Sequence, residues 1–239
     1  MERPAVTPNP VGIIIQARMG STRLPGKILK PVGSRTLLDQ LLKRLSLLRT
    51  PALPVVATSD TERDQVVERF CQSRRVACFR GSEADVLDRY YRCALQYGFQ
   101  QVVRLTGDNP FPDPEELDRL ISLHTRSQAD FSHSFQVLPI GVGAEIFTMK
   151  ALTESWLEGK APQHREHVDE FLLENPQRFR TLQLDPVPAK FRSELRLTVD
   201  TEADYQKACF IAQNAASDCP ATQEVIALAD LYDSRTVLP

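Results

Sequence analysis

The first half of the chain alternates short apolar runs with stretches of helical periodicity, and this alternation limits the fold more than any other feature. Leucines between positions 37 and 48 recur at helical spacing, and similar stripes follow the second and third apolar runs. We expect strands over residues 11–16, 54–58, 76–79 and 101–106. Strands that alternate with helices build a mostly parallel sheet with helices on both faces. The sequence therefore predicts a three-layer α/β fold.

The chain is predicted to form one domain. Its 239 residues suit a single α/β unit, and no repeat or linker divides residues 1–239. Residues 126–150 interrupt the alternation because they mix polar and β-type residues without a helical period, and we expect an inserted hairpin or arm there. A helix over residues 163–174, strands over 181–184 and 195–199, and closing helices are expected to follow.

Charge and cysteine content exclude several classes of protein. The net charge of -2 provides no general attraction to nucleic acid or to an anionic membrane. Residues 1–10 contain three prolines and no apolar core, so we expect no signal peptide. The five cysteines form no CxxC pair, which favours reduced thiols in a cytoplasmic protein.

A basic, glycine-containing loop directly follows the first expected strand. Between positions 11 and 38 the chain has five basic residues and no acid. Gly20 and Gly26 allow backbone N–H groups to approach an anion, and Arg18, Arg23 and Lys27 can neutralise phosphate charge. The spacing differs from a Walker A loop, and Ile28 stands where that motif has its hydroxyl. We interpret the loop as a phosphate-binding loop, with a solvated basic turn as the alternative.

Two aspartates follow expected strands. Asp108 comes after residues 101–106, and Asp200 after residues 195–199. Magnesium in triphosphate sites is held by one or two carboxylates together with phosphate oxygens and water. Both residues are therefore candidate Mg²⁺ ligands. Taken alone, either could instead cap a turn or a helix.

The run IIIQARMGSTRLPGKILKPVG resembles the signature of the cytidylyltransferases that activate sugar acids, and in particular their spore-coat-polysaccharide, SpsF-like branch. The blocks VVATSD, FRGSEADVLDRYYRCA, VVRLTGDNPFPDPE and RLTVDTEADY extend the resemblance over most of the chain. It implies a Rossmann-like nucleotide-diphospho-sugar transferase fold, CTP as a substrate, Mg²⁺ as cofactor and a homodimer. It also implies metal binding by Asp108 and Asp200.

The chemistry of the basic loop and the resemblance to the family together predict the residues of the active site. The expected catalytic residues are Arg18, Lys27 and Asp108. The expected nucleotide-binding residues are Ala17, Arg18, Gly20, Ser21, Arg23, Lys27, Ser59, Gly81 and Ser82. The expected substrate-binding residues are Gly141, Glu145, Arg165 and His167.

Several of these positions have alternative interpretations. Ser82 with Asp85 also forms a capping-box pattern, and Glu145 could be an exposed edge residue. His164 and His167 lie three residues apart, but nothing completes a transition-metal site, so substrate contact or local structure is favoured. Val142-Gly143 replaces the Leu-Asp that is usual in the family, which removes a carboxylate beside the acceptor.

The leading hypothesis is transfer of CMP from CTP to a sugar or sugar acid, with release of pyrophosphate, for surface polysaccharide biosynthesis. One alternative is a glycosyltransferase that uses a nucleotide-sugar donor, although Asp108-Asn109-Pro110 is not its usual D-x-D pair. Another is a nucleotide-binding subunit without turnover. A Rossmann dehydrogenase is disfavoured because no G-x-G-x-x-G follows the first strand.

Overall fold

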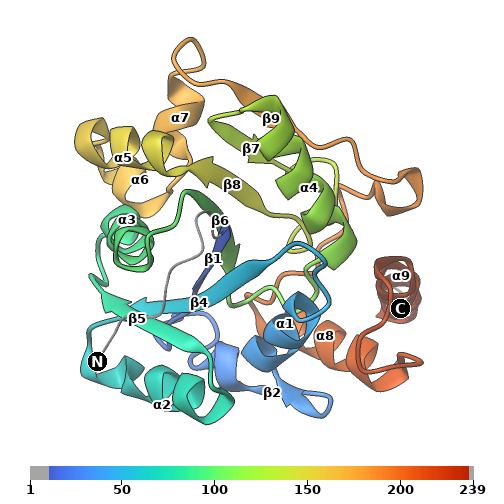
Figure 1. The fold of residues 1–239 in the computed structure, drawn as a ribbon. Helices are drawn as coiled ribbons and strands as arrows, with labels where there is room; N and C mark the ends of the chain where they lie inside the picture. The colour runs from blue at the N-terminus through green and yellow to red at the C-terminus, as the bar shows by residue number, and fades with distance from the viewer. Residues whose placement is uncertain (1–10, 237–239) are drawn as a thin grey trace.

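The computed structural model describes residues 11–236, which form a seven-stranded sheet between layers of helices (Figure 1). The strands of this sheet are β1 (Val11–Gln16), β4 (Ala52–Ser59), β5 (Ala77–Gly81), β6 (Gln101–Thr106), β7 (Phe131–His133), β8 (Glu145–Thr148) and β9 (Thr181–Gln183). A separate antiparallel pair consists of β2 (Pro31–Val32) and β3 (Arg35–Thr36). The prediction that concerns residues 1–10 lies outside the described residues.

Helices connect the strands on both sides. They are α1 (Leu37–Leu45), α2 (Gln65–Arg74), α3 (Val86–Tyr97), α4 (Pro114–Ser127), α5 (Met149–Glu158), α6 (Pro162–Glu166), α7 (Glu170–Glu174), α8 (Glu202–Asn214) and α9 (Thr222–Thr236). Short 3₁₀ turns are η1 (Lys27–Leu29), η2 (Glu62–Asp64) and η3 (Pro188–Lys190). Within residues 11–236, no helix has the length and apolar character needed to span a bilayer.

The strand order is β5-β4-β1-β6-β8-β7-β9, and β8 runs antiparallel to both of its neighbours. The mostly parallel α/β prediction is therefore confirmed. From β1 the chain continues to β4 on one side, and it later returns to β6 on the other. Ligands in such sheets bind where the order reverses, beyond the carboxyl ends of the strands. Here that point lies between β1 and β6.

Two apolar clusters attach the helical layers to the sheet. On one face, Ile13 and Ile15 of β1 pack with apolar residues of α1, α2 and α4. On the other, Ile14 packs with residues of α3, α5 and α7. Successive strand residues point to opposite faces, so the continuous run Ile13-Ile14-Ile15 serves both layers. Figure 1 shows the two layers on either side of the sheet.

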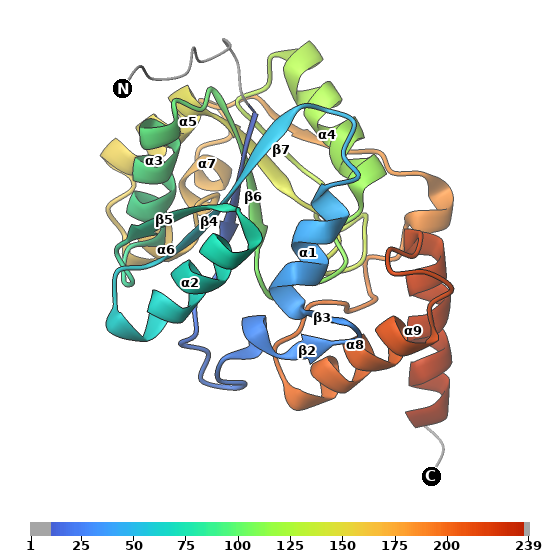
Figure 2. The same cartoon turned by 60° about the horizontal axis from the view of Figure 1, so that its bottom comes forward.

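The C-terminal helices form a third packing unit beside α1. Residues of α8 and α9 bury apolar side chains with Leu24 and Val32 of the N-terminal segment. The hydroxyl of Tyr205 donates to the carbonyl of Pro31 at 2.6 Å. Figure 2 shows α8 next to the β2–β3 pair. The end of the chain thereby supports the loop that follows β1.

Residues 126–150 do not form an arm outside the sheet. The first two residues finish α4, and β7 and β8 then form an antiparallel hairpin. Because β8 also pairs with β6, the hairpin extends the central sheet. The loop between the two strands buries Val137, Leu138 and Val142 with the residues of the C-terminal packing unit, and other residues of it line a cavity, which explains its mixed sequence.

Two predicted C-terminal elements also differ. The helix predicted over residues 163–174 is divided into α6 and α7, because His167 takes an extended conformation and lets Val168 enter the core. Residues 195–199 are not a strand: within residues 11–236 they form a single bridge, between Arg196 and Ile140. Leu195, Leu197 and Val199 are buried in the third cluster, and this burial produces the strand-like alternation.

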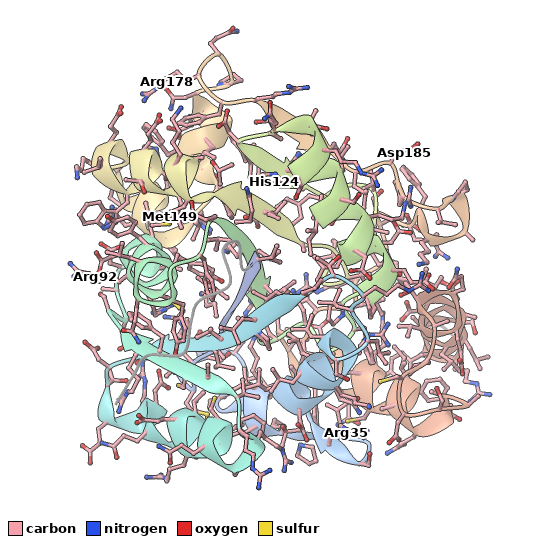
Figure 3. All side chains as sticks on the ribbon, viewed as in Figure 1. Arg35, Arg92, His124, Met149, Arg178 and Asp185 are labelled. Carbon is pink, nitrogen blue, oxygen red and sulfur yellow. The ribbon has the colours of Figure 1, made fainter. Side chains whose placement is uncertain are left out.

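A buried histidine joins α4 to the sheet. His124 is 1% exposed, and its Nε2 lies 2.7 Å from Oε1 of Gln101, while its Nδ1 lies 2.9 Å from Oγ of Ser132 (Figure 3). An amide oxygen only accepts, so Nε2 carries the hydrogen and Nδ1 accepts from the serine. Burial lowers the pKa of His124 to about 4. The ring is therefore neutral in the folded protein.

Acid is expected to destabilise the protein through His124. The pKa of His124 in the folded protein lies below its ordinary value of 6.5. The contribution of neutral His124 to the free energy of unfolding is therefore complete above pH 6.5 and is lost as the pH falls towards 4. Between pH 7 and pH 4.5 the wild type should lose about 2 kcal/mol more free energy of unfolding than His124→Gln. Urea denaturation at both pH values measures this difference. Equal losses in the two proteins would contradict the assignment.

Candidate active site

The basic loop folds tightly after β1. The carbonyl of Met19 accepts from the N–H groups of Ser21 at 3.0 Å and of Gly26 at 3.1 Å. Gly26 has a φ of 69°, in the left-handed region that favours glycine. This residue turns the chain into η1, and Lys27 is the first residue of that turn. The loop therefore directs Lys27 to the carboxyl ends of the strands.

Lys27 joins the two predicted metal ligands. Its Nζ lies 2.7 Å from Oδ2 of Asp108 and 2.9 Å from Oδ1 of Asp200, and it also donates to the carbonyl of Val199 at 2.7 Å. The Lys27 side chain is only 9% exposed, so these ion pairs are shielded from solvent. Two aspartates that are 92 positions apart in the sequence thus face one cation. Their convergence is what the resemblance implies.

Asp200 receives further positive charge. Arg23 lies 3.0 Å from its Oδ1, and Arg196 pairs with its Oδ2. Burial alone would raise the pKa of Asp200, but the bonds to Lys27 and Arg196 and the charge of Arg23 lower it overall. Asp200 therefore stays ionised, the state that metal coordination requires.

A close approach between β1 and β6 brings the aspartate to the loop. The N–H of Gly107 donates to the carbonyl of Gln16 at 2.7 Å. A Cβ at Gly107 would lie 2.9 Å from the Cβ of Ala17, so only glycine fits without a shift. Asp108 follows immediately, and its carbonyl accepts from Val199 at 2.9 Å. The bond between Val199 and Asp108 places Asp200 beside Asp108, although residues 195–199 do not form a strand.

A cavity of about 240 Å³ lies inside this ring of charges. It gathers most of the predicted nucleotide and metal residues in one place. Its lining consists of Gln16, Ala17, Arg18, Gly20, Ser21, Thr22, Arg23, Lys27, Ile28, Thr106, Asp108 and Asp200. The three catalytic candidates Arg18, Lys27 and Asp108 all line it.

Asp64 fastens the loop to the turn after β4. It is fully buried, and its Oδ1 accepts from the N–H of Met19 at 2.8 Å. Its Oδ2 accepts from the hydroxyl of Ser59 at 2.5 Å and from the N–H of Ser59 at 3.3 Å. Sequence reasoning missed this residue because an acid in a helical first turn is ordinary. Its contact with position 19 depends on tertiary structure.

Three predicted nucleotide residues lie beside this cavity but do not line it. Ser59 ends β4 and is bonded to Asp64, whereas Gly81 ends β5. Ser82 Oγ accepts from the N–H of Asp85 at 3.1 Å, and Asp85 itself caps α3 by accepting from Asp88. The predicted capping box is thus corrected: α3 begins at Val86, its N-cap is Asp85, and Ser82 lies in the turn before that cap.

A second cavity of about 560 Å³ adjoins the first and shares Thr106 and Asp108 with it. Its walls come from the end of β6, the β7–β8 loop and the extended segment before Asp200. Gly141 and Glu145, the first two predicted substrate residues, line it. Gly143 lines it as well, so the departure from the usual Leu-Asp lies on the cavity wall.

An ion pair forms part of this wall. Arg104 and Glu145 face each other in the β6–β8 register, and Nη1 of Arg104 donates to Oε1 of Glu145. Nε of Arg104 and Oε2 of Glu145 have no partner among the described residues. Burial raises the pKa of Glu145 to about 8, although Arg104 opposes this rise. Glu145 is thus a buried cavity residue, and the exposed-edge alternative is wrong. Arg104, a charge within an apolar strand, was a signal that sequence reasoning missed.

The remaining two substrate candidates line neither cavity. Nη2 of Arg165 binds Oδ2 of Asp85 at 2.5 Å, and Nη1 donates to the carbonyl of Trp156, so Arg165 joins α6 to α3 and α5. His167 is exposed at the end of α6. His164 Nε2 lies 2.7 Å from Oε2 of Glu174. Residues 11–236 contain no group of three or more His, Cys, Asp or Glu side chains that could hold a metal. The contacts of Arg165 with Asp85 and Trp156 are thus contacts within the protein.

A mostly parallel sheet whose switch point carries a cationic loop and paired aspartates, next to a second cavity, is the arrangement of a nucleotidyltransferase. Comparison with known proteins gives the family. Residues 12–224 match the cytidylyltransferase family, and the chain belongs to it.

The similar proteins cover most of the chain. The spore coat polysaccharide biosynthesis protein SpsF of Bacillus subtilis (strain 168) is 37% identical over 239 residues, which cover 95% of this chain and 98% of that protein. A cytidylyltransferase structure from Leptospira borgpetersenii has a TM-score of 0.88 at 33% sequence identity. The match covers 95% of this chain and 96% of that chain. The 8-amino-3,8-dideoxy-manno-octulosonate cytidylyltransferase of Shewanella woodyi is 31% identical over 57% of this chain and 56% of that protein.

Removal of the Asp64 charge should weaken nucleotide binding. Asp64 accepts hydrogen bonds at both of its carboxylate oxygens, whereas the amide of Asn has only one oxygen. In Asp64→Asn the loop therefore loses the charged group that binds the N–H of Met19. We expect the Kd for CTP, used as the probe, to rise by about tenfold. Asp60→Asn is the matched control, because Asp60 is exposed in the same turn. Calorimetric titration of both variants decides the point, and equal affinities would contradict it.

Proposed function

We propose that the protein transfers CMP from CTP to a sugar or sugar acid and releases pyrophosphate. The observation that carries this proposal is the junction of the two cavities at Asp108. One cavity is lined by the cationic glycine loop, and the other by residues of the β7–β8 hairpin, among them the polar residues Ser134, Gln136 and Glu145. A triphosphate in the first and a sugar in the second would meet beside Asp108.

The loop residues would hold the triphosphate. Arg18, Arg23 and Lys27 supply positive charge, and the backbone N–H of Gly20 could supply a hydrogen bond. In the reaction an acceptor hydroxyl oxygen forms a bond to the α-phosphorus, and the bond from that phosphorus to the β-phosphate oxygen breaks. Pyrophosphate leaves with the electron pair, and the hydroxyl proton passes to solvent. Lys27 stabilises the charge that develops.

Asp108 and Asp200 fit a divalent cation. Both carboxylates already share one cation, the ammonium of Lys27, and their chemistry is that of a magnesium site completed by phosphate oxygens. When bound, Mg²⁺ would offset the charge of the triphosphate and orient the pyrophosphate. Lys27 would then turn from the aspartates towards the phosphates.

The choice of CTP and of a surface-polysaccharide pathway is inferred from family membership and from the relatives' names. Cytoplasmic location and assembly as a homodimer stay predictions. Arg165 and His167 also stay predictions as acceptor contacts, and Ser59, Gly81 and Ser82 as nucleotide contacts.

Pyrophosphate release should be assayed with each of the four nucleoside triphosphates, Mg²⁺, and a panel of sugars and of octulosonic and nonulosonic acids. Release with CTP and one acceptor class supports the proposal. Turnover of a nucleotide-sugar donor without pyrophosphate would favour a glycosyltransferase. Triphosphate binding without release for any pair would favour the non-catalytic subunit.

Lys27→Ala and Asp108→Asn should each lower turnover at least about a hundredfold, because both groups act on charge that develops in the transition state. Lys30→Ala is the control: Lys30 lies three residues on, pairs with Glu202 at 3.5 Å and does not line the cavity. Steady-state pyrophosphate release measures all three variants. Near-normal rates for both Lys27→Ala and Asp108→Asn would contradict the assignment of these residues to the active site.

Metal dependence gives a separate check. A chelator should abolish turnover, and excess Mg²⁺ should restore it. Asp200→Asn should raise the Mg²⁺ concentration for half-maximal rate by about tenfold or more, since one of two anionic ligands is lost. Glu202→Gln, at an exposed position of the same helix, keeps both candidate ligands and serves as the control, because Glu202 pairs with Lys30 and does not line the cavity. Turnover that resists the chelator would refute the metal role.

A further inference from the structure

Lys27 lies between the two candidate metal ligands with its hydrogen-bonding capacity complete. An ammonium group has three hydrogens to donate. Three oxygens accept from Nζ of Lys27 at 2.7 to 2.9 Å, namely Oδ2 of Asp108, Oδ1 of Asp200 and the carbonyl of Val199. The Lys27 side chain is 9% exposed, so these bonds are largely shielded from water. The two carboxylates therefore already share a cation that belongs to the chain.

Two arginines bind the same aspartate. Arg23 lies 3.0 Å from Oδ1 of Asp200, and Arg196 pairs with its Oδ2. Both carboxylate oxygens of Asp200 thus face cationic groups of the protein. Among residues 11–236, the two aspartates belong to no group of three or more His, Cys, Asp or Glu side chains that could hold a metal. A divalent ion that entered without a ligand would have to displace cations that are already bonded.

The charges of this cluster do not attract a divalent ion. Asp108 and Asp200 supply two negative charges. Lys27, Arg23 and Arg196 supply three positive charges, so the cluster has a net charge of +1. Like charges repel each other, and the repulsion is stronger where the side chains are partly removed from water. The nucleotide-free site is therefore electrostatically unfavourable for Mg²⁺.

A triphosphate in the adjoining cavity would reverse this balance. Arg18, Arg23 and Lys27 all line that cavity, so the phosphate oxygens can take the place of carboxylate oxygens as their partners. The triphosphate carries several negative charges, and the site as a whole becomes anionic when it binds. Magnesium in such sites is held by one or two carboxylates together with phosphate oxygens. The nucleotide thus supplies both the ligands and the charge that the two aspartates lack.

We propose that Lys27 excludes free divalent ions from the nucleotide-free protein, so that the metal enters only together with the nucleotide. This inference rests on the proposed metal role of Asp108 and Asp200. The binding of the metal–nucleotide complex transfers Lys27 from the carboxylates to the phosphates. When pyrophosphate and the metal leave, Lys27 pairs with the aspartates again. The ion pairs of Lys27 are then a contact that closes the metal site between turnovers.

Titration with Mn²⁺ in the absence of nucleotide tests the proposal, with the electron paramagnetic resonance signal of the unbound ion as the measurement. Lys27→Met should bind Mn²⁺ at least about tenfold more tightly than the wild type, because it removes one positive charge and frees both carboxylates. Lys30→Met is the matched control, since Lys30 pairs with Glu202 and does not line the cavity. It should keep the wild-type affinity. Equal affinities of Lys27→Met and the wild type, including no binding by either, overturn the proposal.

A second substitution locates the ion. Asp200→Asn, added to Lys27→Met, should abolish the gain in Mn²⁺ affinity, because it removes one of the two carboxylates. A gain that persists in the double variant places the ion elsewhere and overturns the proposal.

Arg23→Gln tests the same electrostatic argument in case Lys27→Met does not fold. Arg23 is 62% exposed, and its loss removes one of the three positive charges at Asp200. Nucleotide-free Mn²⁺ binding should become about threefold tighter. Arg74→Gln is the control, because Arg74 is 47% exposed and pairs with Asp39, outside the cluster. Unchanged affinity in Arg23→Gln counts against the proposal.

The wild type with CTP separates this inference from the proposed function. Enhanced relaxation of water protons by Mn²⁺ reports a complex of protein, metal and nucleotide, measured against CTP and Mn²⁺ without protein. Formation of that complex, with weak Mn²⁺ binding before CTP is added, supports both proposals. If the wild type binds Mn²⁺ as tightly without CTP as with it, this inference alone is overturned. If no such complex forms with any of the four nucleoside triphosphates, the proposed function is overturned as well.

Discussion

The ion cluster around Lys27 is the interaction on which the rest of the site depends. One ammonium group connects the loop after β1, the end of β6 and the segment before α8. These three pieces are far apart in the sequence, and the carboxylates would repel each other without a cation between them. The cluster therefore holds the loop after β1, the end of β6 and the segment before α8 together.

Around this centre, polar contacts lie on both sides of β1. On the β4–β5 side, Asp64 fixes the loop by binding the N–H of Met19. On the β6–β8 side, the strand register sets Arg104 against Glu145 in the wall of the larger cavity. A switch point makes this arrangement possible, because loops from both halves of the sheet meet at one edge.

The local parts of this arrangement could be predicted. The strand 11–16 and the strand 101–106 were located correctly, because continuous apolar runs bounded by turn residues are strong signals. Residues 126–150 contain the β7–β8 hairpin, one of the two forms expected there. The late strand and the unbroken late helix were wrong, because partly buried loops and short broken helices imitate regular patterns. Arg165, which stays a prediction as an acceptor contact, binds Asp85 in the structure, and the motif did not show this contact.

The sequence alone determined the parallel α/β class, the cationic loop with Gly26 before Lys27, and the pair of aspartates, because each depends on residue type and local spacing. Only the tertiary structure decided that Lys27 bridges Asp108 and Asp200 and that Asp64 anchors the loop. These contacts join residues 45 or more positions apart. Hydrogen-bond partners at such separations are set by strand order and packing, which no local pattern encodes.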